Sequence, residues 1–214
     1  VSHILPFSRP DYDRVKVFQS QRISISGVQT KHSLRLNGNS LELTNRGGEY
    51  ILKPVPSGPF ENLDEMPANN HATMQLARQV FGIETAPCAV VFFADQGSPA
   101  FLSSRFDVLP DGTRLLQEDM AQVAQMTGET HGRNYKYDLS YEEIALLLKQ
   151  AISAYPVEAE KYFKIVIFNY LVNNGDSHLK NFSVYRNVQE GTYTLTPAYD
   201  LLNTRIHLPH ETSM

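Results

Sequence analysis

The sequence predicts an α+β fold with two lobes, a β-rich front half followed by a helical back half. Short alternating segments separated by turn residues fill positions 22–53. Further on, a capping box formed by Ser140 and Glu143 begins a helix, and a long apolar run follows it. The chain has 214 residues, of which 42% are hydrophobic and 20% charged. This size and composition are typical of a globular protein with one large domain or two small lobes.

The front half begins with residues 1–21, which are polar and irregular, and we interpret them as a lead-in segment. The segments "RISIS", "HSLRL", "SLEL" and "EYIL" then have the pattern of short strands. Between two of them, Asn37-Gly38-Asn39 is a strong hairpin signal, because Asn and Gly tolerate positive φ. These segments therefore predict an antiparallel meander.

A helix is predicted over residues 68–81, with Gly82 as its stop. Two more strands follow in "APCAVVFFA" and "PAFLSSRF", joined by a turn at "DQGS". The front lobe is thus predicted to span residues 22–106.

The back lobe, residues 107–214, begins with "RLLQEDMAQVAQM", which starts as a strand and turns helical at Glu118 or Asp119. Residues 127–139 are polar and contain glycine, so we expect an exposed loop. The capping box then begins a helix that ends before Pro156.

Pro156 begins a second helix, in which apolar residues fall on every face between Tyr162 and Val172. This distribution predicts a buried central helix. The segments "NFSVYR" and "TYTLTP" then pair as a hairpin.

Composition and termini exclude several classes of protein. The net charge of -4 gives no general basic character that would suggest nucleic-acid binding. The single cysteine, Cys88, cannot form an intrachain disulfide, which fits a reducing compartment. The apolar run at 165–172 is too short to span a bilayer, and the N-terminus lacks the form of a signal peptide. We therefore expect a cytoplasmic protein with no membrane partner.

The polar stretch "NGDSHLKNFS" carries the strongest chemical signal. Asp176 and Asn181 stand five residues apart, the spacing of a protein-kinase catalytic loop. In that loop the Asp accepts the proton of the substrate hydroxyl and the Asn binds a metal ion. Asp200 follows the predicted hairpin, which returns the chain to the same place, as in the segment of a kinase that carries its metal-binding Asp. The alternative is that Asp176 has no chemical role and is only a turn residue.

A kinase also needs a lysine for the phosphates and a loop that covers them. Lys53 in "EYILKP" ends a front-lobe strand and fits the first role, although it can equally be a solubilising lysine at a strand end. The segment "SISGVQTKHS" contains one glycine, Gly27, and its backbone N–H groups fit the second role. It is not a G-x-G-x-x-G sequence.

With these residues in view, the chain resembles the HipA-like serine/threonine kinases of bacterial toxin–antitoxin modules, in their short HipT-type form. The resemblance rests on the blocks "SGVQTKHSL", "YILKP", "NNHATMQLA", "SRFD", "LLQEDMAQ", "NGDSHLKNFS" and "LTPAYDLLNT", and it runs from Arg22 to Thr204. It implies a two-lobed protein-kinase-like fold that uses ATP and Mg²⁺. It also implies a protein substrate such as an aminoacyl-tRNA synthetase, and an antitoxin partner through which DNA is mainly contacted.

The resemblance assigns roles residue by residue. Asp176 matches the catalytic base, Asn181 and Asp200 match the Mg²⁺ ligands, and Lys53 matches the lysine that pairs with the phosphates. The remaining positions implied in nucleotide binding are Ser26, Gly27, Val28, Gln29, Thr30 and Lys31 in the phosphate loop, Ser104, Arg105 and Phe106 near adenine, and His178 and Lys180 in the catalytic loop.

Several of these roles have alternatives. His178 can be a structural hydrogen-bonding residue, and Lys180 can be either a phosphate contact or a solvated lysine. Ser24 and Ser26 match the positions at which the family phosphorylates itself, ejecting the loop and switching the kinase off. Their alternation with isoleucines is equally that of a plain strand with one polar face.

Two departures from the family pattern keep other functions open. The family usually has an acidic residue where this chain reads "NNH", and family members continue beyond the position of Met214 with a helical portion that completes the back lobe. The first alternative is a non-catalytic nucleotide-binding or interaction module. The second is a metal-dependent hydrolase that uses Asp176, His178 and Asp200.

Overall fold

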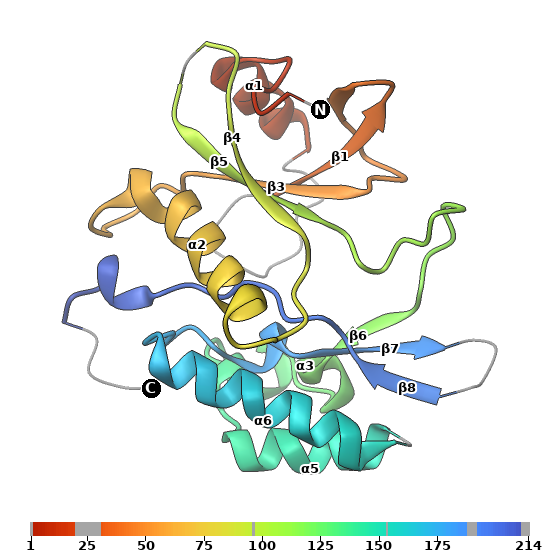
Figure 1. Ribbon diagram of the computed structural model, residues 1–214. Coiled ribbons are helices and arrows are strands. Elements are labelled where there is room, and N and C mark those ends of the chain that lie inside the picture. The colour runs from red at the N-terminus through yellow and green to blue at the C-terminus, as the bar shows by residue number, and fades with distance from the viewer. Residues whose placement is uncertain (1, 20–30, 96, 153, 188–191, 211–214) are drawn as a thin grey trace. The chain divides into compact units, whose positions relative to one another are not determined.

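A computed structural model describes residues 2–19, 31–95, 97–152, 154–187 and 192–210 (Figure 1). The chain forms two compact units. Unit 1 takes in residues from 1–72, 87–105 and 206–209, and unit 2 takes in residues from 73–86, 106–205 and 210–214. Strands dominate unit 1 and helices dominate unit 2, so the predicted α+β class is confirmed.

Unit 1 is built on a five-stranded antiparallel sheet in the order β2-β1-β3-β5-β4. Its strands are β1 (His32–Asn37), β2 (Ser40–Leu43), β3 (Tyr50–Pro54), β4 (Cys88–Phe92) and β5 (Pro99–Ser104). The predicted hairpin turn joins β1 to β2, and Gly38 adopts a φ of 58° there. The predicted "RISIS" strand lies outside the described residues.

The connection from β2 to β3 differs from the predicted meander, because β3 pairs with β1 and not with β2. Between the two strands, Thr44 donates its backbone N–H to Ser33 and Glu49 donates its own to Leu34. Gly48 makes this passage possible, since a Cβ at that position would lie 2.6 Å from the Cβ of Ser33. The crossing puts Leu34 in the middle of the sheet, where it is fully buried.

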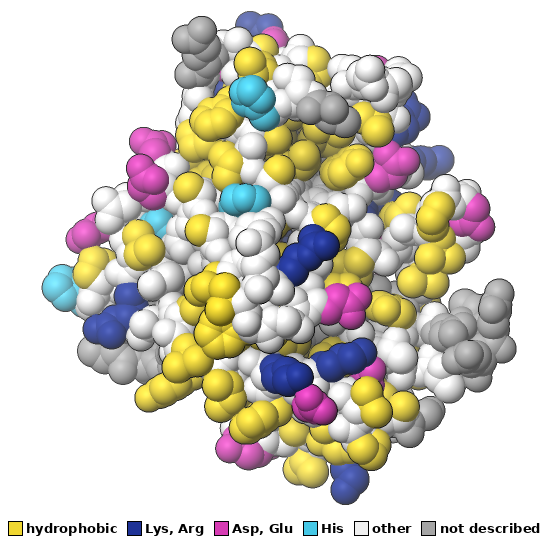
Figure 2. Space-filling model, viewed as in Figure 1, with side chains coloured by type: hydrophobic (Ala, Val, Ile, Leu, Met, Phe, Trp, Pro, Cys, Tyr) yellow, Lys and Arg dark blue, Asp and Glu magenta, His cyan; other side chains and the backbone are white. Residues whose placement is uncertain are grey.

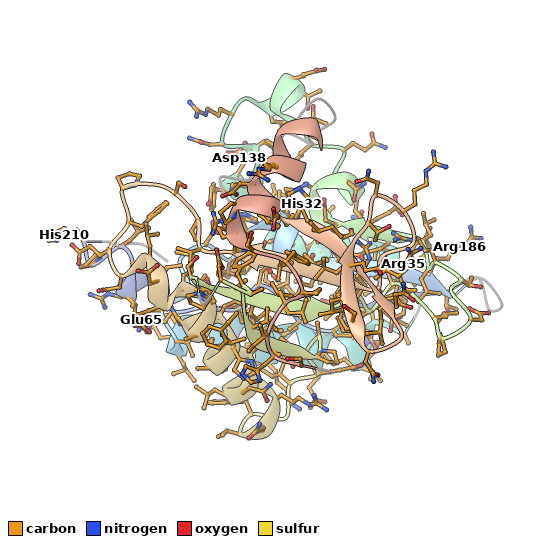
Figure 3. All side chains as sticks on the ribbon, turned by 90° about the horizontal axis from the view of Figure 1, so that it is seen from above. His32, Arg35, Glu65, Asp138, Arg186 and His210 are labelled. Atoms are coloured by element: carbon orange, nitrogen blue, oxygen red, sulfur yellow. The ribbon has the colours of Figure 1, made fainter. Side chains whose placement is uncertain are left out.

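The lead-in is not irregular as predicted. The backbone N–H of Leu5 donates to Phe92 at 2.7 Å, so the segment pairs with the edge of β4, and helix α1 (Arg9–Gln19) follows it. Leu5 and Tyr12 are buried in the core of unit 1, and the Tyr12 hydroxyl bonds to Nδ1 of His32 at 2.6 Å. Figure 3 shows His32 beside this helix.

Helix α2 (Met66–Gln79) follows the short 3₁₀ turn η2 (Leu63–Glu65), and its first half belongs to unit 1 and its second half to unit 2. It confirms the predicted helix within two residues at each end. Gly82 has a φ of 63° and is the predicted stop.

Unit 2 combines a three-stranded antiparallel sheet with helices. The sheet has the order β6-β7-β8 and consists of β6 (Gln117–Asp119), β7 (Ser183–Asn187) and β8 (Thr192–Leu195). The helical segments are α3 (Met120–Val123), α4 (Gly128–His131), η3 (Tyr135–Tyr137), α5 (Tyr141–Ala151), α6 (Tyr155–Leu171), η4 (Leu179–Asn181) and η5 (Thr204–Ile206). The predicted hairpin is therefore β7 and β8, joined by hydrogen bonds in register.

The predicted helix start at Ser140 is confirmed, since Ser140 and Glu143 form a reciprocal capping box at the start of α5. The predicted strand-to-helix change is also confirmed, because Asp119 caps α3. The segment 127–139 is more ordered than the predicted loop, because it contains the single turns α4 and η3.

The prediction that apolar residues bury every face of α6 is wrong. Phe168 is fully buried, whereas Phe163 is 63% exposed and Tyr170 is 68% exposed. Figure 2 shows hydrophobic side chains gathered over the region of α6, interrupted by charged ones. Two polar residues, Glu158 and Asn169, are buried instead. Among the described residues, no helix combines the length and the apolar character needed to cross a bilayer.

Candidate functional site

The polar stretch "NGDSHLKNFS" forms a loop in unit 2, and the end of α6 holds this loop by hydrogen bonds. The buried Asn169 donates its side-chain N–H to Oγ of Ser177 at 2.8 Å. Its amide oxygen accepts a hydrogen bond of 2.9 Å from the side chain of Asn174, which is also buried. These two side-chain hydrogen bonds connect the end of α6 to the start of the loop, although the side-chain oxygen of Asn174 has no hydrogen-bond partner among the described residues.

A second support comes from Thr204, 23 residues beyond Asn181. Its Oγ1 accepts a hydrogen bond of 2.8 Å from the backbone N–H of Gly175 and donates one of 2.8 Å to the carbonyl of Asn173. Its own N–H also donates to Asn173 at 3.1 Å. The segment after the β7–β8 hairpin is thereby hydrogen-bonded to the loop that stands before the hairpin in the sequence.

Asp176 projects from this loop, with half of its side chain exposed. One carboxylate oxygen, Oδ1, is surrounded by three groups. The Tyr137 hydroxyl donates a short hydrogen bond to it, the Lys136 ammonium lies 3.8 Å away, and Nε2 of His178 lies 3.7 Å away. A half-exposed carboxylate with one oxygen held in this way has the geometry of a general base whose second oxygen accepts a proton.

Asn181 is positioned by the same loop. Its side-chain N–H donates to the backbone carbonyl of Asp176 at 2.9 Å. Because the amide nitrogen is engaged as a donor, the amide oxygen is the atom with which this side chain can bind a cation. The predicted D-x-x-x-x-N pair is thus connected by a hydrogen bond across the loop.

Asp200 follows the β7–β8 hairpin and has a backbone φ of 57°. A residue other than glycine rarely adopts this left-handed conformation, and such residues are frequent at functional sites. Tyr199, just before it, fixes the approach, since its hydroxyl donates to the carbonyl of Lys180 at 2.8 Å and also bonds to Ser183. Burial raises the pKa of the Tyr199 hydroxyl, so it stays protonated.

Lys180 is paired and not solvated. Its ammonium donates to Oδ2 of Asp119 at 2.9 Å, with side chains that are 25% and 15% exposed. The other oxygen of Asp119 caps helix α3 through the backbone N–H of Gln122. Lys180 is therefore held against β6, in a fixed position beside the catalytic-loop residues.

His178 is buried, and this burial lowers the pKa of its imidazole although the nearby Asp176 carboxylate acts in the opposite direction. Among the described residues its Nδ1 is one of the few buried side-chain atoms without a hydrogen-bond partner. The ring of Tyr137 lies edge-on against it, with centroids 5.1 Å apart. His178 therefore supports the Asp176 loop as a mostly neutral ring.

The predicted nucleotide-binding residues of unit 1 lie on its sheet. Lys53 is buried on β3, opposite Phe101 of β5. Ser104 ends β5, and the backbone N–H of Arg105 donates to Glu49 at 2.7 Å. Asn70, in the "NNH" block of α2, is buried, and its side-chain oxygen has no hydrogen-bond partner among the described residues.

Phe106 belongs to unit 2, where its ring stacks at a tilt on that of Tyr199, with centroids 5.6 Å apart. The aromatic residue predicted near adenine is thereby joined to the segment that carries Asp200. The phosphate-loop positions Ser26, Gly27, Val28, Gln29 and Thr30, together with Ser24, lie outside the described residues. Lys31, the last of that loop, is described and exposed.

Within the described part of the chain, no group of three or more His, Cys, Asp or Glu side chains could hold a metal ion. Mg²⁺ does not require such a group, because it is usually bound by one or two carboxylate or amide oxygens together with water and substrate phosphates. Asn181 and Asp200 fit this kind of site by the chemistry of their oxygens.

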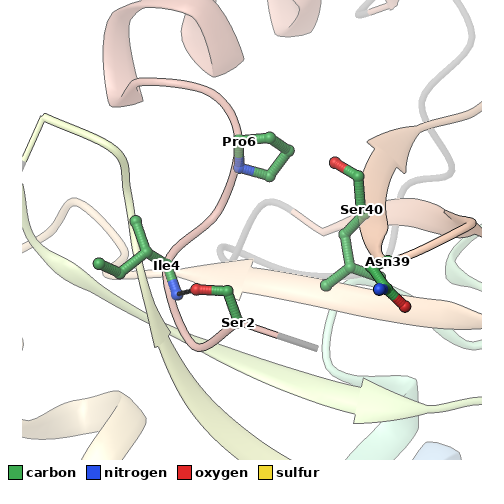
Figure 4. A pocket seen from close by; sticks show the side chains of 6 residues that line it. Ser2, Ile4, Pro6, Asn39 and Ser40 are labelled. Carbon is green, nitrogen blue, oxygen red and sulfur yellow. Dashed lines mark hydrogen bonds between the residues drawn. The ribbon is translucent and has the colours of Figure 1, made fainter.

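A surface pocket of unit 1 is not a candidate for this chemistry. It is lined by Ser2, Ile4, Pro6, Asn39, Ser40 and Leu41 (Figure 4). None of the predicted site residues is among these six, and the backbone N–H of Ile4 donates to Oγ of Ser2.

Sequence reasoning missed the residues that reach the loop from other segments. Lys136 and Tyr137 come from the segment predicted as an exposed loop, Asp119 from the start of α3, and Thr204 from η5. No spacing rule connects them to Asp176, since they lie 28 to 57 positions away from it in the sequence. The one signal in that segment was its cations, since Arg133 and Lys136 could be expected to contact an acidic group.

Comparisons with known proteins identify the family of this chain. The family model described as HipA-like C-terminal domain matches residues 23–214. A protein of Haemophilus influenzae named "Putative kinase" is 32% identical over 206 residues, covering 93% of this chain and 58% of its own length. The serine/threonine-protein kinase toxin HipA of Shewanella oneidensis is 26% identical over 200 residues, covering 87% of this chain and 44% of the toxin.

Solved structures show the same relationship. The HipA chain in the complex of Shewanella oneidensis HipA, HipB and operator DNA superposes with a TM-score of 0.64 at 26% identity, over 86% of this chain and 44% of that one. The Helicobacter pylori proinflammatory kinase CtkA superposes with a TM-score of 0.57 at 12% identity, over 78% of this chain and 53% of that one, and shows the fold alone. The predicted kinase-like fold is confirmed, and the chain spans about half the length of the curated relatives it matches.

Proposed function

Because the chain belongs to the HipA-like C-terminal domain family, we propose that it is part of a serine/threonine protein kinase that transfers the γ-phosphate of ATP to a protein. The observation that carries the proposal is the loop in which the Asn181 side chain donates to the backbone of Asp176. This bond leaves the carboxylate of Asp176 available as a base and the amide oxygen of Asn181 available as a metal ligand. The division into a lead-in of residues 1–21, an N-lobe of 22–106 and a C-lobe of 107–214 belongs to the proposal.

In this reaction Asp176 accepts the proton of the attacking hydroxyl through the carboxylate oxygen that Tyr137 does not engage. The amide oxygen of Asn181 and the carboxylate of Asp200 would hold Mg²⁺, which neutralises charge on the phosphates when bound. Lys53 would pair with the phosphates, and Phe106 would contact adenine beside Ser104 and Arg105. Little covalent chemistry is asked of the protein, so positioning and charge provide most of the catalysis.

Lys180 and His178 take supporting roles in the same proposal. Lys180 is held by Asp119 at 2.9 Å, and in that position it can add positive charge near a phosphoryl group. His178 orders the loop and does not bind the metal, since it is buried against the ring of Tyr137.

We place the kinase in a toxin–antitoxin module. The Shewanella toxin is described in a complex with HipB and operator DNA, and the same kind of partner would serve this protein. An antitoxin would then make most of the DNA contacts, which suits a chain with a net charge of -4. The protein substrate would be an aminoacyl-tRNA synthetase, the proposed location is the cytoplasm, and phosphorylation of Ser24 or Ser26 would switch the enzyme off.

The test is the intact mass of the protein after incubation with Mg·ATP. We expect gains in steps of about 80 Da, one phosphoryl group each, located by peptide mapping to Ser24 or Ser26. An Asp176→Asn chain should gain none while melting at the same temperature as the parent. Equal phosphate gain in both chains would overturn the assignment of Asp176.

One observation supports a second candidate, a non-catalytic nucleotide-binding module. Where the family usually has an acidic residue, this chain has Asn70, which is buried and carries no charge to pair with Lys53. Saturable ATP binding with no mass gain, on the chain itself or on added synthetases, would favour this candidate. The metal-dependent hydrolase that uses Asp176, His178 and Asp200 stays a prediction, and metal-dependent phosphate release without an ATP requirement would support it.

A further inference from the structure

Residues 127–139, which were predicted to form an exposed loop, contact Asp176, the proposed catalytic base. It forms the 3₁₀ turn η3, which brings Lys136 and Tyr137 to one oxygen of Asp176. The hydroxyl donates its hydrogen bond to Oδ1, and the ammonium lies 3.8 Å from the same atom. A side chain that is half exposed would otherwise sample several rotamers.

The two residues also support each other. The Lys136 ammonium lies 4.7 Å from the centroid of the Tyr137 ring, within the range of a cation–π contact. The same ring makes a T-shaped contact with His178, with centroids 5.1 Å apart. Tyr137 therefore contacts both a cation and a buried ring, and its hydroxyl donates to the carboxylate of Asp176.

We propose that Tyr137 and Lys136 are positioning residues that fix the Asp176 carboxylate by its Oδ1, so that Oδ2 alone faces the substrate hydroxyl. This inference rests on the proposed kinase function for its kinetic consequence, but the contact itself does not depend on it. A hydrogen bond from a neutral hydroxyl and an ion pair on one oxygen orient the carboxylate plane, and a base must be oriented toward the proton that it accepts.

Three variants separate this role from a general structural one. Tyr137→Phe removes only the hydroxyl, and Lys136→Met removes the charge while keeping the length of the side chain. Tyr135→Phe is the matched control, because Tyr135 lies in the same 3₁₀ turn and its hydroxyl does not contact Asp176. All three should melt at the parent temperature, since Lys136 and Tyr137 lie at the surface.

The first readout is the rate of self-phosphorylation, followed by intact mass at a series of Mg·ATP concentrations. We expect Tyr137→Phe to lower the saturated rate constant about 10- to 100-fold, while the half-saturating ATP concentration changes less than about twofold. Lys136→Met should lower the same rate constant by a smaller factor, and the Tyr135→Phe control should leave it unchanged. An unchanged saturated rate in Tyr137→Phe, with an active parent, would overturn the proposal.

The second readout needs no activity. In protein labelled with ¹³C at tyrosine Cζ, the Tyr137 resonance is the one missing from Tyr137→Phe. It should move toward the position of a solvent-exposed tyrosine when Asp176→Ala removes the acceptor, while the Tyr135 resonance stays in place. A Tyr137 resonance that is indifferent to Asp176→Ala would overturn the contact. If the contact is found and the parent transfers no phosphate, the proposed kinase function fails and the kinetic role of Tyr137 fails with it.

Discussion

Two glutamates on α6 have nearly identical ion pairs and opposite surroundings, and they give a sharp test of what stabilises unit 2. Glu158 lies 2.8 Å from Lys161, and Glu160 lies 2.7 Å from Lys164. The Glu158 side chain is only 6% exposed, whereas that of Glu160 is 69% exposed. Glu158 also accepts a hydrogen bond of 2.9 Å from the backbone N–H of Leu195 in β8.

The expected cost follows from these contacts. In Glu158→Ala the buried N–H of Leu195 loses a charged acceptor and gains no water, which costs about 2–3 kcal/mol. The ion pair with Lys161 adds little, because the lysine side chain is 48% exposed and becomes hydrated again. For a chain of this size the melting temperature should fall by about 5–10 °C. Glu158→Gln keeps an acceptor for the N–H and should lose about half as much.

The assay is urea and thermal unfolding of Glu158→Ala, Glu158→Gln and Glu160→Ala, followed by circular dichroism. Glu160→Ala should not change the melting temperature measurably, because exposed ion pairs contribute little. A similar loss in both alanine variants would refute the reasoning, since it would mean that the ion pairs, and not the buried bond to β8, carry the energy. A changed urea slope would indicate an altered unfolded state instead.

Four further predictions concern stability. Phe168→Ala, in a fully buried position, should cost about 3–5 kcal/mol in urea unfolding, whereas Phe163→Ser, at a position that is 63% exposed, should cost less than about 0.5 kcal/mol. Ser140→Ala should cost about 1 kcal/mol by removing the cap of α5. Hydrogen bonds from Ser140 hold the pKa of Glu143 below its usual range. The stabilisation that follows from this lowered pKa is complete above the pKa of a glutamate in the unfolded chain, and it is lost as the pH falls through the folded-state pKa. Glu143→Gln should therefore make the free energy of unfolding fall less steeply at acid pH. Gly48→Ala should cost about 1–3 kcal/mol, because its methyl would lie 2.6 Å from a Cβ of β1, and the urea midpoint measures it.

The local elements could be predicted from sequence because short-range rules decide them. The hairpin turn at Gly38, the helix stop at Gly82 and the capping box at Ser140 each depend on residues within four positions. The pairing of β3 with β1 could not be predicted, since it depends on how the chain crosses a strand at Gly48. Helix α1 was missed; among residues 9–14, whose side chains the structure describes, Tyr12 is the one buried in the core.

The motif residues of the candidate site could be named from their spacing, but their surroundings could not. Asp176 and Asn181 lie on one loop, so their spacing in the sequence is enough to predict that they lie close together. The residues that orient Asp176 come from a turn 39 positions earlier, and Lys180 meets an acid 61 positions earlier. Contacts of this kind are set by tertiary packing, which leaves no periodic signal in the chain.

Helix α6 shows why its sequence was misread and what its polar residues do. Apolar residues occur on all of its faces, yet Phe163 and Tyr170 are exposed while Glu158 and Asn169 are buried. Each of the two buried polar side chains reaches a segment that carries site residues. Glu158 bonds to β8, which leads to Asp200, and Asn169 bonds to the loop of Asp176. One helix therefore contacts both segments, and its buried polar side chains tie each of them to the same rigid element.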